Sequence, residues 1–134
     1  MSEITIYPRF KPLLLGRLPV HHLRAFGLDL AEGHVAFTIP AQRHALRSHP
    51  DSFMSCVPYL AQTVTDPTHV GQSPRHAGKG FELVREVNEA GLIVLVAVLI
   101  KPTGRGVYMV KSTYPIGSGK LENRLRKGHM IATE

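Results

Sequence analysis

Residues 41–53, AQRHALRSHPDSF, contain two histidines and two arginines at spacings that could handle a phosphate group. His44 and His49 are five residues apart, and Pro50 directly follows the second of them. On a regular helix, side chains five residues apart point about 140° away from each other. Because a residue before proline avoids helical geometry, we expect the helix to break at His49 and its imidazole to turn towards His44.

These residue types suit RNA cleavage without a metal. One imidazole would take the proton from the ribose 2′-hydroxyl, and the other would protonate the leaving 5′-oxygen. Imidazole titrates near neutral pH, so it can fill either role. Arg43 and Arg47 lie one turn apart and would stabilise the charge that builds on the phosphate. His44 and His49 are therefore the predicted catalytic pair, and the alternative is an ordinary exposed basic helix.

A second candidate cluster lies at the end of the predicted strand VYMVKSTY, residues 107–114. Strict alternation predicts two faces, one formed by Tyr108, Val110, Ser112 and Tyr114 and the other by Met109, Lys111 and Thr113. Ser112 could donate a hydrogen bond to a phosphate oxygen, and Tyr114 could stack on a base or orient a proton carrier. The alternative is a polar strand end that emerges into solvent.

Two turn-rich segments add basic residues that could contact a phosphate. SPRHAGKGFEL carries Arg75, His76 and Lys79 around two glycines, but it lacks P-loop spacing, which favours a flexible basic loop. Arg105 lies at the tip of the predicted hairpin TGRG, where it either reaches a phosphate or is solvated. Lys79 and Arg105 are therefore secondary candidates for substrate binding.

Metal and serine-hydrolase sites find no support in the residue spacing. His21 and His22 are adjacent rather than one helical turn apart, no HExxH motif is present, and the lone Cys56 cannot form a thiolate cluster. No GxSxG motif is present either. We therefore expect neither a metal nor a cofactor.

The chain is basic and has the length of one domain. Its 134 residues contain 16 Lys and Arg against 10 Asp and Glu, a formal net charge of +6, which favours a polyanionic partner. The longest apolar run, residues 91–100, is shorter than the roughly 20 residues that span a bilayer, so no membrane partner is expected. The N-terminus has no signal-peptide pattern, which predicts action in the cytoplasm.

Hydrophobic periodicity predicts helices first and a strand meander afterwards. Helices are expected over 18–28, 41–48 and 53–64, and strands over 33–40, 81–87, 92–100 and 107–114. An extended lead-in (1–15) and a terminal helix or tail (117–134) complete a single nuclease-like domain, 1–134. This order predicts an α+β fold in which N-terminal helices pack on a three- to four-stranded antiparallel sheet.

Four stretches carry a resemblance to a known family: LLLGRLP (13–19), HVAFTIPAQRHALRSHPDSF (34–53), VPYLAQTVTDPTHVGQ (57–72), and LIVLVAVLI followed by VYMVKSTYPI (92–116). They resemble the phage and polymorphic-toxin branch of the barnase–EndoU–colicin–RelE (BECR) nuclease superfamily. The likeness covers residues 16–114. The shared pattern is a strand, a helix with histidines before a proline, a helix ending in an Asp-Pro turn, and a sheet ending in Ser/Thr-x-Tyr.

The resemblance implies a metal-independent endoribonuclease, serving as a toxin in phage, toxin–antitoxin or contact-dependent inhibition systems. His44 and His49 would be acid and base, attack through the 2′-hydroxyl would leave a 2′,3′-cyclic phosphate, and Ser112 or Thr113 would supply a hydroxyl beside Tyr114. The implied substrate is RNA, with tRNA among the candidates. An acidic antitoxin or immunity protein would be the partner.

Two other functions fit the same sequence. A non-catalytic nucleic-acid-binding module would account for the basic charge, although aromatic residues for base stacking make up only 7% of the chain. An inactive interaction protein with the same fold is the third hypothesis. The chain is either free-standing or delivered as part of a larger toxin.

Overall fold

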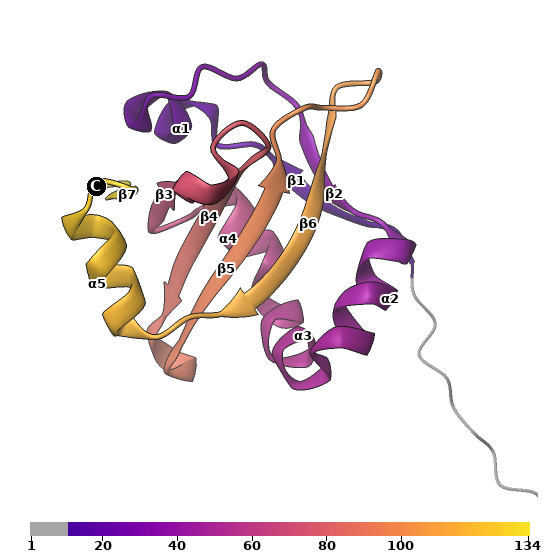
Figure 1. Ribbon diagram of the computed structural model, residues 1–134. Helices are drawn as coiled ribbons and strands as arrows, with labels where there is room; N and C mark the ends of the chain where they lie inside the picture. Colours follow the sequence, from indigo (N-terminus) through magenta and orange to yellow (C-terminus); the bar gives the residue numbers. More distant parts are fainter. Residues whose placement is uncertain (1–10) are drawn as a thin grey trace, which may run out of the picture.

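The computed structural model describes residues 11–134 (Figure 1). Its strands are β1 (Leu13–Arg17), β2 (His34–Phe37), β3 (His69–Gly71), β4 (Gly80–Val87), β5 (Leu92–Leu99), β6 (Val107–Pro115) and β7 (Met130–Ala132). Its α-helices are α1 (Val20–Phe26), α2 (Ile39–Ser48), α3 (Pro50–Cys56), α4 (Leu60–Thr65) and α5 (Ser118–Arg126). Short 3₁₀ turns are η1 (Val57–Tyr59), η2 (Pro74–His76) and η3 (Asn88–Ala90).

Within residues 11–134 the strands form one seven-stranded sheet in the order β1-β2-β6-β5-β4-β3-β7. Neighbouring strands are antiparallel except β2 and β6, which run parallel with Val35 opposite Tyr108. β5, LIVLVAVL, lies in the middle of this order and pairs along its whole length with β4. Its branched apolar side chains suit a central strand.

The expected three- to four-stranded antiparallel sheet is wrong, although the fold is α+β. The sheet has seven strands within the described residues, and one pair is parallel. β3 and β7 contain three residues each, which is too short to display an alternating pattern. β1 begins within the expected lead-in (1–15), and its sequence LLLGR does not alternate between apolar and polar residues.

Helices form in the three regions where the sequence predicts them, although their bounds differ. α1 ends at Gly27, whose φ of 117° is the left-handed conformation that glycine adopts readily. α2 begins after Thr38, whose hydroxyl accepts a hydrogen bond from the Ala41 N–H. The single helix expected over 53–64 is divided into α3, η1 and α4, with Pro58 inside the 3₁₀ turn. Among residues 11–134, no helix is both long enough and apolar enough to cross a membrane.

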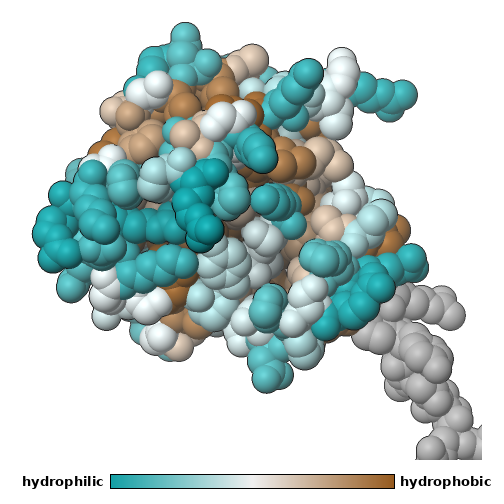
Figure 2. All heavy atoms as spheres, viewed as in Figure 1, coloured by the Kyte–Doolittle hydropathy of each residue, from teal (hydrophilic) through white to brown (hydrophobic). Residues whose placement is uncertain are grey.

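The two faces of the sheet are covered unequally. Phe53 of α3 and Leu60 of α4 pack with Val96 in the larger apolar core, on what we call the helical face. The neighbouring residue on β5, Leu95, points to the opposite or open face, where it packs with Leu121 of α5 in a smaller core. Figure 2 shows hydrophilic residues gathered at the left of the view, over α5. Because α5 covers only one end of the open face, polar side chains can occupy the remainder of that face.

Both ends of the described chain join the edges of the sheet. β7 pairs with β3, and a side-chain carbon on Gly71 would lie 2.3 Å from the carbonyl oxygen of His129, so this pairing requires glycine. β1 forms the other edge, so residues 13–15 of the expected lead-in belong to the sheet. Residues 1–10 lie outside the described part of the chain.

Candidate active site

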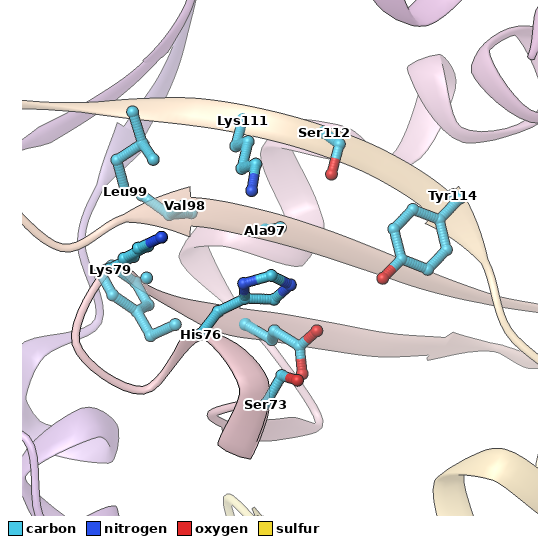
Figure 3. Close-up of a pocket in the computed structure, with 12 residues that line it drawn as sticks. Ser73, His76, Lys79, Ala97, Val98, Leu99, Lys111, Ser112 and Tyr114 are labelled. Carbon is cyan, nitrogen blue, oxygen red and sulfur yellow. The ribbon is translucent and has the colours of Figure 1, made fainter. Parts of the chain in front are cut away.

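A pocket of about 100 Å³ lies on the open face, between β6 and the loop that carries η2 (Figure 3). Its polar lining comes from Ser73, His76 and Lys79 of the loop, Glu82 of β4, and Lys111, Ser112 and Tyr114 of β6. Ala97 of β5 lies between the strands that contribute them, paired with Glu82 on one side and Ser112 on the other. The fold thus brings two segments together that are about 30 residues apart in sequence.

A β-bulge decides which residues of β6 enter the pocket. Ala97 pairs with Ser112 and Val98 pairs with Val110, so Lys111 is an extra residue with no partner on β5. Such an insertion reverses the inside–outside alternation of the strand beyond it. Lys111 and Ser112 therefore both lie on the open face, and Figure 3 shows the Lys111 side chain directed over the pocket.

The consequence is visible in the burial of the neighbouring residues. Val110 belongs to the larger core, and Thr113 is also buried, opposite Val96, with its hydroxyl donating to the Leu95 carbonyl oxygen at 2.9 Å. Strict alternation would place Val110 and Thr113 on opposite faces, so that prediction is wrong beyond the bulge. Ser112 consequently points to the open face rather than sharing the face of Val110.

The loop before β4 is tied down by hydrogen bonds. The Gln72 side-chain amide donates to the carbonyl oxygens of Ala77 and Gly80, the second at 3.0 Å. The Lys79 N–H donates to the His76 carbonyl oxygen at 2.9 Å. These hydrogen bonds fix His76 and Lys79 at the rim of the pocket. The sequence of this segment predicts only a flexible basic loop.

The charges around the pocket leave it positive. Glu82 is buried, and its carboxylate accepts a hydrogen bond from the Arg124 guanidinium of α5. Burial lowers the pKa of Arg124. Across the described residues, neither Lys79 nor Lys111 has a carboxylate within ion-pair distance. An anion entering the pocket would therefore meet two lysines whose charges are not already neutralised.

Tyr114 closes the pocket at the α5 end. Its side chain is partly buried, and burial raises the pKa of its phenol, so the hydroxyl carries its proton at neutral pH. The Lys120 ammonium of α5 lies 5.3 Å from the centre of the Tyr114 ring. Ser73 and Ser112 offer two further hydroxyls to the same pocket. The pocket thus contains one imidazole, two lysine ammoniums, three hydroxyls and the ion-paired carboxylate of Glu82.

The structure brings three of the predicted site residues together and places the predicted histidine pair elsewhere. Lys79, Ser112 and Tyr114 line one pocket. His44 lies on α2 and His49 at the junction of α2 and α3, where both are exposed. Neither histidine is among the described residues that line the pocket. α2 packs its apolar side against the larger core, so it belongs to the helical face, whereas the pocket lies on the open face.

The remaining candidates also lie outside the pocket lining. Arg43 and Arg47 are exposed on α2, and Arg105 is exposed in the turn between β5 and β6. Thr113 is buried on the helical face by the bulge. Of the two candidate hydroxyls, Ser112 and Thr113, the fold therefore exposes only that of Ser112 to a ligand in the pocket.

Three residues of this site carry little signal in the sequence. His76 was visible as part of a basic loop, but nothing local indicates that this loop folds over the sheet. Strict alternation along the strand separates Lys111 from Ser112 and Tyr114, with which it lines the pocket. Glu82 lies in a strand whose partner, Arg124, is 42 residues away. Only the sheet pairing and the position of α5 connect these residues.

Residues 11–134 contain no group of three or more His, Cys, Asp or Glu side chains placed to hold a metal ion. Comparison of the chain with protein-family models, curated proteins and solved structures found no significant match.

Proposed function

We propose that the protein is an endoribonuclease that cleaves RNA without a metal, and that the pocket on the open face is its active site. His76 takes the proton from the ribose 2′-hydroxyl as the 2′-oxygen attacks the phosphorus. Tyr114 gives its proton to the 5′-oxygen as the bond between phosphorus and that oxygen breaks. The products are a 2′,3′-cyclic phosphate and a free 5′-hydroxyl.

The observation that carries this proposal is the convergence in one pocket of His76, Tyr114 and two lysines that have no carboxylate partner among residues 11–134. Lys79 and Lys111 would hold the phosphate and stabilise the charge that builds on it. Ser112 would donate a hydrogen bond to a non-bridging oxygen. Each group needed for transfer of two protons at a phosphodiester is thus supplied by the chain itself.

The protonation of Tyr114 decides the assignment of roles. Since burial raises the pKa of its phenol, this group holds a proton at neutral pH and suits the general acid. Imidazole is the side chain best suited to accept a proton near neutral pH, so His76 is assigned as the base. After cleavage, His76 releases its proton to water and Tyr114 recovers one.

The size of the pocket favours a polymer over a small metabolite. Its volume of about 100 Å³ is well below the roughly 300–1,000 Å³ of typical small-molecule sites. One phosphodiester group fits this scale, with the rest of the chain lying across the surface. The net charge of +6 further favours a polyanion.

We further propose that the enzyme acts on cytoplasmic RNA as a toxin, with tRNA among its candidate targets, and that an acidic antitoxin or immunity protein inhibits it. Such an inhibitor would present carboxylates to Lys79 and Lys111 and block the pocket. Expression should arrest growth, and co-expression of an acidic inhibitor should restore it. Substitution of both lysines with methionine should remove the need for the inhibitor.

The direct test is cleavage of RNA in EDTA. Purified protein should yield fragments with 2′,3′-cyclic phosphate and 5′-hydroxyl ends, and RNA with 2′-deoxyribose at the cut site should stay intact. Lys111→Met should reduce kcat/KM by at least tenfold, whereas the matched control Lys101→Met, at an exposed lysine in the β5–β6 turn, should not. A requirement for Mg²⁺ would refute the proposal, and salt-dependent binding without cleavage would indicate a binding module instead.

A further inference from the structure

We infer that Lys120 of α5 is a positioning residue of this site, whose ammonium stabilises the negative charge that Tyr114 acquires when it gives up its proton. The catalytic role of Lys120 rests on the proposed function. The interaction between the Lys120 ammonium and the Tyr114 ring is independent of that function, because it follows from their geometry. The two parts can therefore be tested separately.

The geometry is that of a cation over an aromatic ring. The Lys120 Nζ lies 5.3 Å from the centre of the Tyr114 ring, within the roughly 6 Å over which such contacts are energetically significant. Ionisation of the phenol places a full negative charge on the oxygen and ring. The attraction to an ammonium at this distance is then stronger than for the neutral phenol, so Lys120 favours the ionised form.

The position of Lys120 is set by the anchoring of α5. Leu121, the next residue, is buried in the smaller core. Arg124 lies one turn further along the same side of the helix and donates a hydrogen bond to the buried carboxylate of Glu82. An apolar contact and a buried ion pair thus hold α5 so that Lys120 lies against Tyr114.

Within the described part of the chain, Lys120 is the one cation found over the Tyr114 ring, although other charged groups line the same pocket or anchor α5. The charged or titratable residues that line the pocket or hold α5 are His76 and Lys79 from the loop, Glu82 from β4, Lys111 from β6, and Arg124 from α5. The Glu82 charge is balanced by Arg124, and the two lysines are assigned to the phosphate. Burial makes the Tyr114 phenol a weaker acid. We infer that the Lys120 ammonium, 5.3 Å from the ring centre, acts against that effect.

The first test is titration of Tyr114 itself, without RNA. The ring resonances of the full chain would be followed by NMR with rising pH, with Tyr114→Phe used to assign the signal. Lys120→Met should raise the pKa of Tyr114, and Lys120→Arg should restore it towards the wild-type value. Lys127→Met, which removes an exposed charge at the end of the same helix, should leave the pKa of Tyr114 unchanged. An unchanged titration in Lys120→Met would overturn the inference.

The second test separates catalysis from simple attraction of RNA. Lys120→Met should lower kcat by about two- to fivefold with little change in KM, and it should move the alkaline limb of the kcat profile to higher pH. A higher KM and a weaker salt dependence, with kcat and the alkaline limb unmoved, would mean that Lys120 merely tethers the substrate and would overturn the catalytic role. If the wild type cleaves no RNA while the Tyr114 titration responds as expected, the proposed function fails and the Lys120–Tyr114 interaction stands.

Discussion

Val110 and Ser112 lie on opposite faces of the sheet although they are two residues apart on one strand. Val110 is buried in the larger core opposite Val98, whereas Ser112 lines the pocket opposite Ala97. The extra residue between them, Lys111, causes this reversal. The composition of the candidate active site therefore depends on a single inserted residue in β6.

Substitutions on the two sides of the bulge should have different effects on stability. Val110→Ala should lower the free energy of unfolding by about 2 kcal/mol, because it removes buried methyl groups and leaves a cavity. Lys111→Ala should change it by no more than about 0.5 kcal/mol, since this side chain is exposed. Urea denaturation measures both values, and a large loss in Lys111→Ala would contradict the described register.

The two locations of histidine can be distinguished by activity. His76→Ala should lower the rate of RNA cleavage by about 10²-fold or more, the usual size of a general-base contribution. His44→Ala and His49→Ala test the catalytic pair that the sequence predicts on and after α2. Cleavage of a defined RNA in EDTA by all three variants decides between them. A comparable loss in the His44 and His49 variants, with His76→Ala fully active, would transfer the site to the helices.

The Glu82–Arg124 pair should matter for folding. Arg124→Met should cost about 3 kcal/mol or more of unfolding free energy, because it leaves the buried Glu82 carboxylate without its partner. The double variant with Glu82→Gln should recover a substantial part of this loss. A double-mutant cycle measured by urea denaturation gives the coupling energy directly. Additive losses would show that the pair contributes nothing beyond its separate side chains.

His69 should make the protein less stable in mild acid. Burial on β3 lowers its pKa below the usual 6.5, with the nearby Glu86 carboxylate acting in the opposite direction. The folded state therefore binds this proton less readily than the unfolded state. The stability contributed by neutral His69 is complete above pH 6.5 and is lost as pH falls through the lowered value.

The measurement is the free energy of unfolding at pH 7.5 and 5.5. The wild type should lose stability over this interval, and His69→Gln should lose less. His34→Gln, at an exposed position, is the matched control and should behave like the wild type. His22 has a pKa that burial also lowers, so His22→Gln should remove a further part of the slope. Equal slopes in the wild type and His69→Gln would refute the prediction.

Much of the local structure could be predicted from the sequence. The apolar periodicity of α1 and of the α2–α4 region, the glycine that ends α1, and the long strands β4, β5 and β6 depend on residues that are neighbours along the chain. Lys79, Ser112 and Tyr114 could also be chosen as candidates, because polar groups beside apolar strands are conspicuous in the sequence. These features need no knowledge of distant contacts.

The arrangement of those parts was decided only by tertiary structure. β3 and β7 exist because each finds a partner, and the parallel pairing of β2 with β6 joins segments separated by about 70 residues. The β6 bulge and the folding of the His76 loop over the sheet likewise depend on hydrogen bonds to distant strands. Secondary-structure propensity depends on residues that are neighbours along the chain, so it cannot predict pairing with distant strands. The sequence therefore determined which groups are available, and the sheet pairing determined which of them meet.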